Sequence, residues 1–111
     1  MTQAALVLTT VSTADQARSL AERLVQDRLA ACVSVGAPVE SCFRWNGEVT
    51  VESEVPLTIK TDSSRIAELT QWLCDNHPYD EPEVLALHVA AGSESYLRWV
   101  RNEVTLTAAR S

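Results

Sequence analysis

Residues 33–59 read VSVGAPVESCFRWNGEVTVESEVPLTI, and this stretch decides the fold. Apolar side chains recur at alternate positions on both sides of a central Trp-Asn-Gly at residues 45–47. A period of two is that of a strand with one apolar face. The stretch therefore predicts two antiparallel strands joined by a tight turn. The alternating residues are Val33, Val35, Ala37, Val39, Phe43 and Trp45, then Val49, Val51, Val55, Leu57 and Ile59.

The register of this hairpin can be argued from its side chains. A two-residue Asn-Gly loop would pair Trp45 with Glu48, setting an apolar residue against a charged one. A three-residue loop places Gly47 in the left-handed conformation that such loops require. Cross-strand neighbours share a face, so we predict the three-residue loop. It pairs Phe43 with Val49, Val35 with Leu57, and Val33 with Ile59.

The length of the hairpin has a consequence for assembly. Residues 33–44 would span about 40 Å if straight, whereas a domain of this size has a radius of gyration of about 13 Å. The hairpin should therefore protrude, with Pro38 and Pro56 as points where it bends. An exposed tip bearing Phe43 and Trp45 is an aggregation hazard unless a partner covers it. Self-association is the expected solution.

The flanking segments supply the remaining elements of an α+β fold. Their order is β-α-β-β-α-β-α, and the first six match the ferredoxin-like βαββαβ arrangement. The long central β-hairpin and the extra C-terminal helix complete one domain over residues 1–111. Right-handed crossovers would place both main helices on one face of a four-stranded sheet. The flanking elements are a strand at Ala4–Val11, a helix from Ser12 or Thr13 to about Leu29, a helix from Ser63 or Ser64 to about Asn76, a strand at Val84–Val89, and a helix from Ser93 or Ser95.

Composition excludes several classes of function. The formal net charge is −6, and the nine Lys and Arg residues are scattered, so no basic stripe exists to follow a nucleic acid. The N-terminus lacks the pattern of a signal peptide, and no apolar run approaches the roughly 20 residues of a membrane span. A cytoplasmic protein with reduced thiols is expected. The three cysteines are Cys32, Cys42 and Cys74.

Four short stretches, taken together, resemble the CutA divalent-ion-tolerance family. The similarity covers about residues 6–100. It implies a ferredoxin-like subunit, a tight homotrimer made by edge-to-edge strand pairing, likeness to the trimeric PII signalling proteins, and a role in tolerance of divalent metals, often copper. The stretches are LAAC at 29–32, FRWNG at 43–47, IKT at 59–61 and HPYDEPE at 77–83.

The resemblance also locates a metal site from which this chain departs. In the family, copper binding is associated with a cysteine after the first strand and a His-His pair before Pro-Tyr. Thr9 stands at the cysteine position and Asn76 at the first histidine, leaving His77. Threonine and asparagine are poor copper ligands beside thiolate and imidazole.

His77 is the candidate metal contact. A purely structural role at the end of a helix stays open as well. A protonated imidazole just past a helix C-terminus is stabilised by the helix dipole. Asp80, Glu81 and Glu83, which follow it in the sequence, make a metal or ligand contact the alternative. General-base catalysis would require a carboxylate partner and a pocket that spacing does not show.

Lys60, Tyr79 and Glu83 are the candidate ligand-binding residues. In the family the lysine corresponding to Lys60 lies near the cleft between subunits, which implies an anionic ligand. Each has a plainer alternative: Lys60 as a surface lysine, Tyr79 packed at an interface, and Glu83 as a solvated carboxylate.

The leading hypothesis is a homotrimer implicated in divalent metal (copper) tolerance, with no catalysis. It requires no cofactor and takes Cu(II) or another divalent cation as ligand. Its only expected macromolecular partner is itself, with neither nucleic acid nor membrane. A PII-like module that senses a small ligand through Lys60 and the His77 loop is the alternative, together with a scaffold trimer. A hydrolase using His77 is a further hypothesis, although no nucleophile signature is present.

Overall fold

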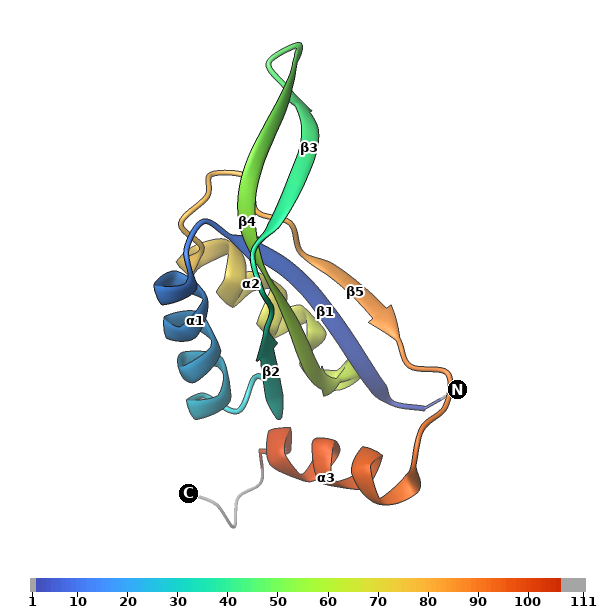
Figure 1. Ribbon diagram of the computed structural model, residues 1–111. Coiled ribbons are helices and arrows are strands. Elements are labelled where there is room, and N and C mark those ends of the chain that lie inside the picture. Colours follow the sequence, from blue (N-terminus) through green and yellow to red (C-terminus); the bar gives the residue numbers. More distant parts are fainter. Residues whose placement is uncertain (1, 107–111) are drawn as a thin grey trace.

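The computed structural model describes residues 2–106, and these form one layered α+β unit (Figure 1). The expected order of elements is confirmed, except that the second strand is broken in two. The elements are β1 (Ala4–Val11), α1 (Ala14–Gln26), β2 (Cys32–Val35), β3 (Val39–Trp45), β4 (Glu48–Asp62), the 3₁₀ turn η1 (Ser63–Arg65), α2 (Ile66–Asn76), β5 (Leu85–His88) and α3 (Glu94–Val104).

The sheet has the strand order β2-β4-β1-β5, with β3 paired to the far half of β4. All pairings are antiparallel. Strand β1 alternates between the two faces: Val7 and Val11 are fully buried, whereas Leu6 and Leu8 are half-buried. This alternation sets one face of the sheet against α1 and α2 and leaves the other free of these two helices.

Helices α1 and α2 lie on the covered face, as the right-handed crossovers predict (Figure 1). The core beneath them draws apolar side chains from both helices and from the central strands. Its residues include Val7 of β1, Leu24 of α1, Ile59 of β4, and Leu69 and Leu73 of α2.

The ends of the helices differ in detail from the sequence expectation. Thr13 caps α1, its side chain accepting a hydrogen bond from Gln16 N. The helix ends at Gln26 and not near Leu29, because Arg28 adopts a positive φ of 57°. Helix α3 begins after Ser93, one of its two expected caps.

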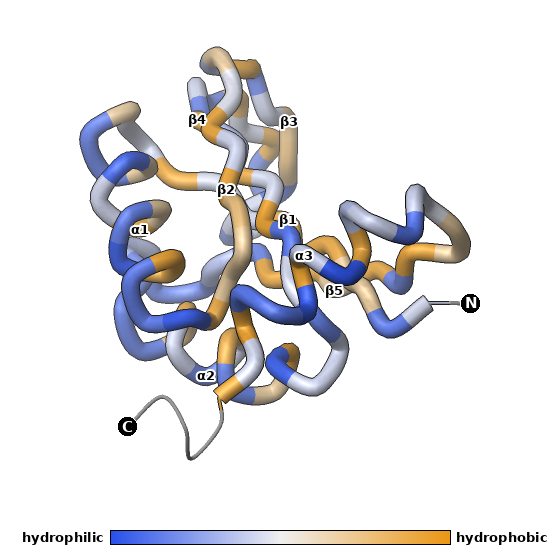
Figure 2. The backbone as a smooth tube through the Cα atoms, turned by 90° about the horizontal axis from the view of Figure 1, so that it is seen from below, coloured by the Kyte–Doolittle hydropathy of each residue, from blue (hydrophilic) through white to orange (hydrophobic). Residues whose placement is uncertain are grey.

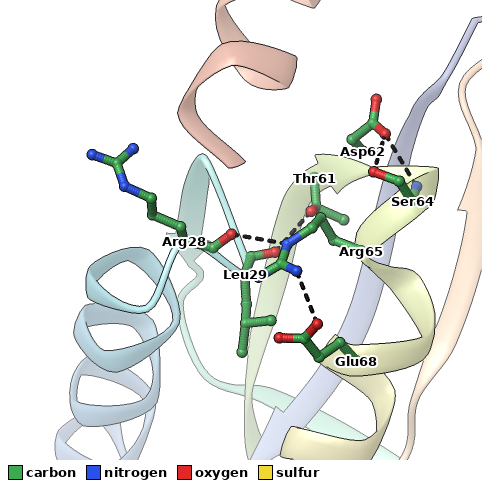
Figure 3. A network of polar contacts seen from close by, with 7 residues as sticks. All are labelled: Arg28, Leu29, Thr61, Asp62, Ser64, Arg65 and Glu68. Atoms are coloured by element: carbon green, nitrogen blue, oxygen red, sulfur yellow. Dashed lines mark hydrogen bonds and ion pairs between the residues drawn. The ribbon is translucent and has the colours of Figure 1, made fainter. Parts of the chain in front are cut away.

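Asp62, and not Ser63 or Ser64, caps the segment leading into α2 (Figure 3). Its carboxylate accepts from both the backbone N–H and the hydroxyl of Ser64. Arg65 then reaches from η1 to the Arg28 carbonyl at 3.3 Å and to Glu68 at 2.9 Å. These bonds tie the start of α2 to the loop that follows α1.

The hairpin tip shows that the predicted three-residue loop is wrong. Trp45 pairs with Glu48, and Phe43 with Thr50. Asn46 and Gly47 have φ values of 51° and 81°, so both central residues are left-handed. Two positive φ values define the type I′ turn, whose twist matches that of the strands it joins. This backbone preference outweighs the apolar pairing that favoured the longer loop.

The base of the same hairpin confirms the predicted register. Val35 pairs with Leu57, and Val33 with Ile59. The pairing registers at the base and at the tip differ by one residue. Gly36 lies opposite Pro56 and Val39 opposite Glu54, so the first arm advances three residues where β4 advances two. The surplus residue lies in the break at residues 36–38, where Pro38 has no N–H to donate.

The hairpin protrudes from the body of the chain, as its length predicts. The described residues measure 50 × 30 × 23 Å along their principal axes, and the hairpin forms one end of the long axis (Figure 1). Its apolar side chains are exposed on both faces: Trp45 is 54% exposed and Val49 is 66% exposed.

Candidate ligand site at the foot of the hairpin

His77 lies directly after α2 and has both ring nitrogens engaged. The backbone N–H of Tyr79 donates to Nδ1 at 3.0 Å, so Nδ1 carries no proton. Nε2 then bears the proton and donates to the Thr10 carbonyl at 2.9 Å, with Thr9 Oγ1 at 3.1 Å. This arrangement requires a neutral imidazole.

The pKa of His77 is consistent with that geometry. Burial lowers its pKa below the ordinary value, and the bond to Thr10 and the charge of Glu54 act weakly in the opposite direction. Because Nδ1 accepts the Tyr79 N–H, the geometry favours a neutral ring over the protonated imidazole that its place after a helix suggested.

Glu54 of β4 joins the hairpin to the loop after His77, and sequence reasoning missed it. Its Oε2 accepts from Tyr79 Oη at 2.9 Å and from Thr10 Oγ1 at 3.0 Å. Ser12 donates in turn to Tyr79 Oη at 3.2 Å. The available signal was that Glu52 and Glu54 stand two residues apart, since such residues share one face of a strand.

The pKa of Glu54 reflects these bonds. Burial raises the pKa of the carboxyl, but hydrogen bonds from Ser41, Tyr79 and Thr10, with the neighbouring His77, bring it below its usual value. Burial of the Tyr79 hydroxyl, and then the neighbouring Glu54 carboxylate, raise the pKa of Tyr79. Glu54 is therefore a fixed anion at the foot of the hairpin.

A cavity of about 540 Å³ opens between the hairpin and the loop at residues 79–83. Two of the four residues predicted from the sequence, Tyr79 and Glu83, line it together. His77 stands behind Tyr79, with ring centroids 4.9 Å apart. The other lining residues are Thr10, Ser41, Cys42, Phe43, Trp45, Glu52, Glu54, Asp80 and Glu81.

Lys60 does not join this group. It lies six residues beyond Glu54 on β4, about 20 Å along an extended strand. Its ammonium contacts the Ser34 hydroxyl and lies 3.9 Å from Cys32 Sγ, on the face of the sheet away from the helices.

The donor set around His77 does not fit a copper centre. Thr9 offers only a hydroxyl, and the Asn76 amide is engaged with Arg23 and the Trp72 carbonyl. Among residues 2–106, no group of three or more His, Cys, Asp or Glu side chains is placed to hold a metal ion. A metal centre built on three such side chains would therefore need donors beyond those that residues 2–106 bring together.

The fold and this site define a class: a ferredoxin-like domain whose central hairpin protrudes and whose two crossover helices lie on one face of the sheet. Residues 5–103 match the family model described as CutA1 divalent ion tolerance protein. The chain belongs to that family, as the resemblance of its motifs indicates.

Curated relatives agree with the assignment. The chain is 41% identical to the divalent-cation tolerance protein CutA of Thermus thermophilus, over 86% of this chain and 93% of that protein. It is 42% identical to the chloroplastic CutA protein of Arabidopsis thaliana over 87% of its own length, but it spans only 53% of that protein.

A solved structure confirms the architecture. CutA from Xylella fastidiosa superimposes with a TM-score of 0.91 at 34% identity, covering 94% of this chain and all of that one. No helix in the described range is both long enough and apolar enough to cross a bilayer.

Proposed function

We propose that this chain assembles into a homotrimer that acts in divalent-cation tolerance and catalyses no reaction. The observation that carries the proposal is the combination of unpaired sheet edges with exposed apolar side chains beside them. The cation role rests on membership of the CutA1 family. The trimer rests on the chain's own surface.

Two different sheet edges are open within the described residues. Strand β3 pairs only with β4, and β5 pairs only with β1. Unpaired N–H and C=O groups on such edges are templates for another strand. Pairing the β3 edge of one copy with the β5 edge of the next joins unlike surfaces, which generates a closed ring when the rotation permits. Three copies close this ring in the proposed assembly.

Apolar side chains accompany these edges. Leu85 and Leu87 of β5 are 55% and 47% exposed on the side of the sheet away from α1 and α2. Tyr96 and Trp99 of α3 stack at 5.6 Å and are also exposed. Figure 2 shows apolar stretches on β5 and α3 at the same side of the molecule. Exposed apolar side chains gathered on one side of a chain mark a surface for association with another protein.

Light scattering coupled to gel filtration tests the trimer. The expected mass is three times the 12.2 kDa of the chain. Replacing Leu85 and Leu87 together with lysine should lower the mass to that of a monomer, because charges then stand on the β5 edge. The matched control is Val25→Lys, at a 43% exposed position on α1. A monomeric wild-type chain at micromolar concentration would refute the assembly.

Calorimetric titration with Cu(II) tests the cation role. His77 is the proposed contact, and the single chain's poor donor set predicts that binding requires the assembled trimer. Saturable binding should weaken in His77→Ala and in the β5 lysine variant. Binding lost only in a cysteine-free variant would move the site to the thiols.

A PII-like ligand-sensing role is the second candidate. The contact of Lys60 with Ser34 and Cys32 favours it, because a cationic group there faces the side of the sheet away from α1 and α2. An anion such as phosphate or a nucleotide should then raise the melting temperature of wild type and not of Lys60→Ala. A scaffold role predicts a protein partner in pull-down experiments and no such shift.

The cytoplasm is the proposed location, predicted from the sequence alone. Cell fractionation with an antibody to the natural protein is the direct measurement. Recovery from the periplasm or an organelle would contradict it.

A further inference from the structure

Helix α1 is followed by an arginine at a position where glycine is the usual residue. Asp27 closes the helix, and Arg28 comes next with a φ of 57°. The Arg28 N–H donates to the Val25 carbonyl at 3.1 Å. The Leu29 N–H donates to the Leu24 carbonyl at 3.0 Å. These two bonds form the Schellman motif, in which the left-handed residue is most often glycine because a Cβ there is strained. Such strain persists only where surrounding contacts enforce it.

The side chain of Arg28 makes such a contact, with the last turn of α3. Its Nη1 donates to the Glu103 carbonyl at 2.9 Å and lies 4.0 Å from the Glu103 carboxylate. The final carbonyls of a helix have no partner within the helix, and they carry the negative end of its dipole. The guanidinium of Arg28 therefore caps α3 from another part of the chain.

The backbone of Arg28 is held as well. Its carbonyl accepts a hydrogen bond from Arg65 Nε at 3.3 Å, at the start of α2 (Figure 3). One residue thus connects the end of α1, the start of α2 and the end of α3. The guanidinium that caps α3 therefore starts from a backbone fixed on both sides.

The first half of α3 has little support from the rest of the chain. Of residues 94–99, only Leu97 is half-buried, and the other five are exposed. The buried side chains of the helix are Val100 and Val104, which pack with Ala31 next to the start of β2. The last turn of α3 therefore determines where the whole helix lies.

Packing at this last turn is incomplete. A cavity of about 300 Å³ lies between the end of α1 and the end of α3. Atoms that border an open space have fewer contacts than atoms of a filled core. A hydrogen bond from a charged donor then supplies a larger share of the attachment. The cavity is lined by Val25, Gln26, Arg28, Ala30, Ala31 and Glu103.

The exposed half of α3 carries the aromatic side chains that we assign to assembly. Tyr96 and Trp99 stack with ring centroids 5.6 Å apart. Tyr96 precedes Glu103 by seven residues, about 10 Å along a helix. A rotation about the capped end therefore displaces these rings more than it displaces the buried last turn.

We propose that Arg28 is a positioning residue, which fixes α3 so that Tyr96 and Trp99 meet a second copy of the chain in one orientation. The cap lies within one chain, whereas its consequence for assembly rests on the proposed homotrimer. The strain at the end of α1 is offset by a contact surface that is ordered before binding.

Hydrogen exchange measured by mass spectrometry tests the cap in a single subunit. The full chain is used in the Leu85→Lys/Leu87→Lys background, so that no neighbouring copy protects α3. Arg28→Gly keeps the left-handed backbone and removes the guanidinium. Amides of α3 should exchange about tenfold faster or more, because a bond from a charged donor is lost. Amides of α1 and α2 should change less than about twofold.

Two further variants separate the cap from the ion pair. Arg28→Lys keeps a cationic donor and should restore most of the protection of α3. Glu103→Gln removes the carboxylate but keeps the backbone carbonyl, so exchange in α3 should stay within about twofold of the parent chain. If Glu103→Gln frees α3 as much as Arg28→Gly does, the ion pair holds the helix and the cap is refuted.

Dissociation of the assembly on dilution tests the consequence. Light scattering coupled to gel filtration should show Arg28→Gly dissociating at a concentration about threefold or more above that of wild type, because a loose α3 must be ordered on binding. Arg28→Lys should dissociate near the wild-type concentration. Urea denaturation of Arg28→Gly in the monomeric background should show little change, since relief of strain offsets the added freedom of the unfolded chain.

The two measurements fail separately. Unchanged exchange of α3 in Arg28→Gly would overturn the cap. Faster exchange with unchanged dissociation would overturn the role in assembly, because neighbouring copies alone would then order the helix. A monomeric wild type would refute the homotrimer, and with it the contact to a second copy, while the exchange measurement would still decide whether Arg28 fixes α3.

Discussion

Strand β4 passes through two different environments, and its two halves obey different rules. The half that pairs with β2 lies under the helices, and Leu57 and Ile59 are almost completely buried. The half that pairs with β3 stands in solvent, and Val49 and Val51 are 66% and 57% exposed. Burial sets the register in the first half, because a one-residue slip would turn its apolar side chains into water. In the second half, the geometry of the Asn46-Gly47 turn sets the register.

The difference shows when side-chain pairing is a reliable guide to register. Apolar pairing predicts Val33 with Ile59 correctly, since both face a core. The same argument fails at Phe43 and Val49, where the facing environment is water on both sides. There the type I′ preference of Asn46-Gly47 decides.

The largest expected effect comes from removing a buried side chain from the base. Ile59→Ala should lower the free energy of unfolding by about 2–5 kcal/mol, as truncation of a fully buried Ile does. Val49→Ala at the tip should cost less than about 0.5 kcal/mol in a separated subunit. Urea denaturation of both variants in the Leu85→Lys/Leu87→Lys background measures this. Equal losses would refute the contrast between the two halves.

Gly36, at the break between the halves, should give the next largest effect. A Cβ at this position would lie 2.9 Å from Pro56 Cγ, closer than side chains ordinarily approach. Gly36→Ala should therefore cost about 1–3 kcal/mol through strain, measured by the same denaturation. Gly92→Ala is the control, because its Cβ would meet Leu97 at an ordinary 3.4 Å. A neutral Gly36→Ala would show that the break shifts freely.

Gly47 at the tip tests the turn alone. A Cβ there meets nothing within 4 Å, but φ is 81°, so only backbone strain is added. Gly47→Ala should lower the free energy of unfolding by about 1 kcal/mol. Asn46→Gly, which suits a positive φ, should be nearly neutral. If Gly47→Ala stabilises the chain, the type I′ turn is not what sets the register of the tip.

The smallest effect concerns pH at the junction of the two halves. The pKa of His77 is lowered in the folded chain, so the unfolded chain takes up a proton more readily. Stability should therefore fall as the pH drops from about 6.5, the value of an unperturbed histidine, towards the folded pKa. The free energy of unfolding measured between pH 7.5 and about 5 follows this loss.

His77→Gln should flatten that slope, since glutamine does not titrate. A second loss is expected below about pH 4.5, where protonation of Glu54 removes the anion that Tyr79 and Thr10 hold, because the folded pKa of this carboxyl is lowered. An unchanged slope in His77→Gln would contradict the neutral imidazole.

Sequence periodicity was sufficient for most of the fold. The strand at Ala4–Val11, the end of α2 at Asn76 and the protruding hairpin follow from local patterns and from Pro78, which disfavours helix before it. The break at residues 36–38 could not be predicted from local patterns, because the alternation of apolar residues continues through Ala37. The extra residue is visible only in how the strands pair in the structure.

The candidate site was harder to predict than the fold. Tyr79 and Glu83 share a motif and line one cavity, and their role as ligand contacts stays a prediction. Glu54 lies 25 residues from Tyr79 in the chain and meets it only through the fold. The neutral state of His77 depends on burial and on the Tyr79 backbone, neither of which its position after a helix reveals.

The surplus residue in the first arm of the hairpin decides which side of the ribbon the aromatic rings occupy. If this extra residue lay in the turn, Phe43 and Trp45 would lie on the same face of the hairpin as Val49 and Val51, away from the carboxylates. Because the extra residue lies at residues 36–38, the two aromatic rings lie on the same face as Glu52 and Glu54. Chain length between Val35 and Trp45 is thus as much a determinant of this surface as residue identity. A one-codon insertion there could redirect the surface without altering a single lining side chain.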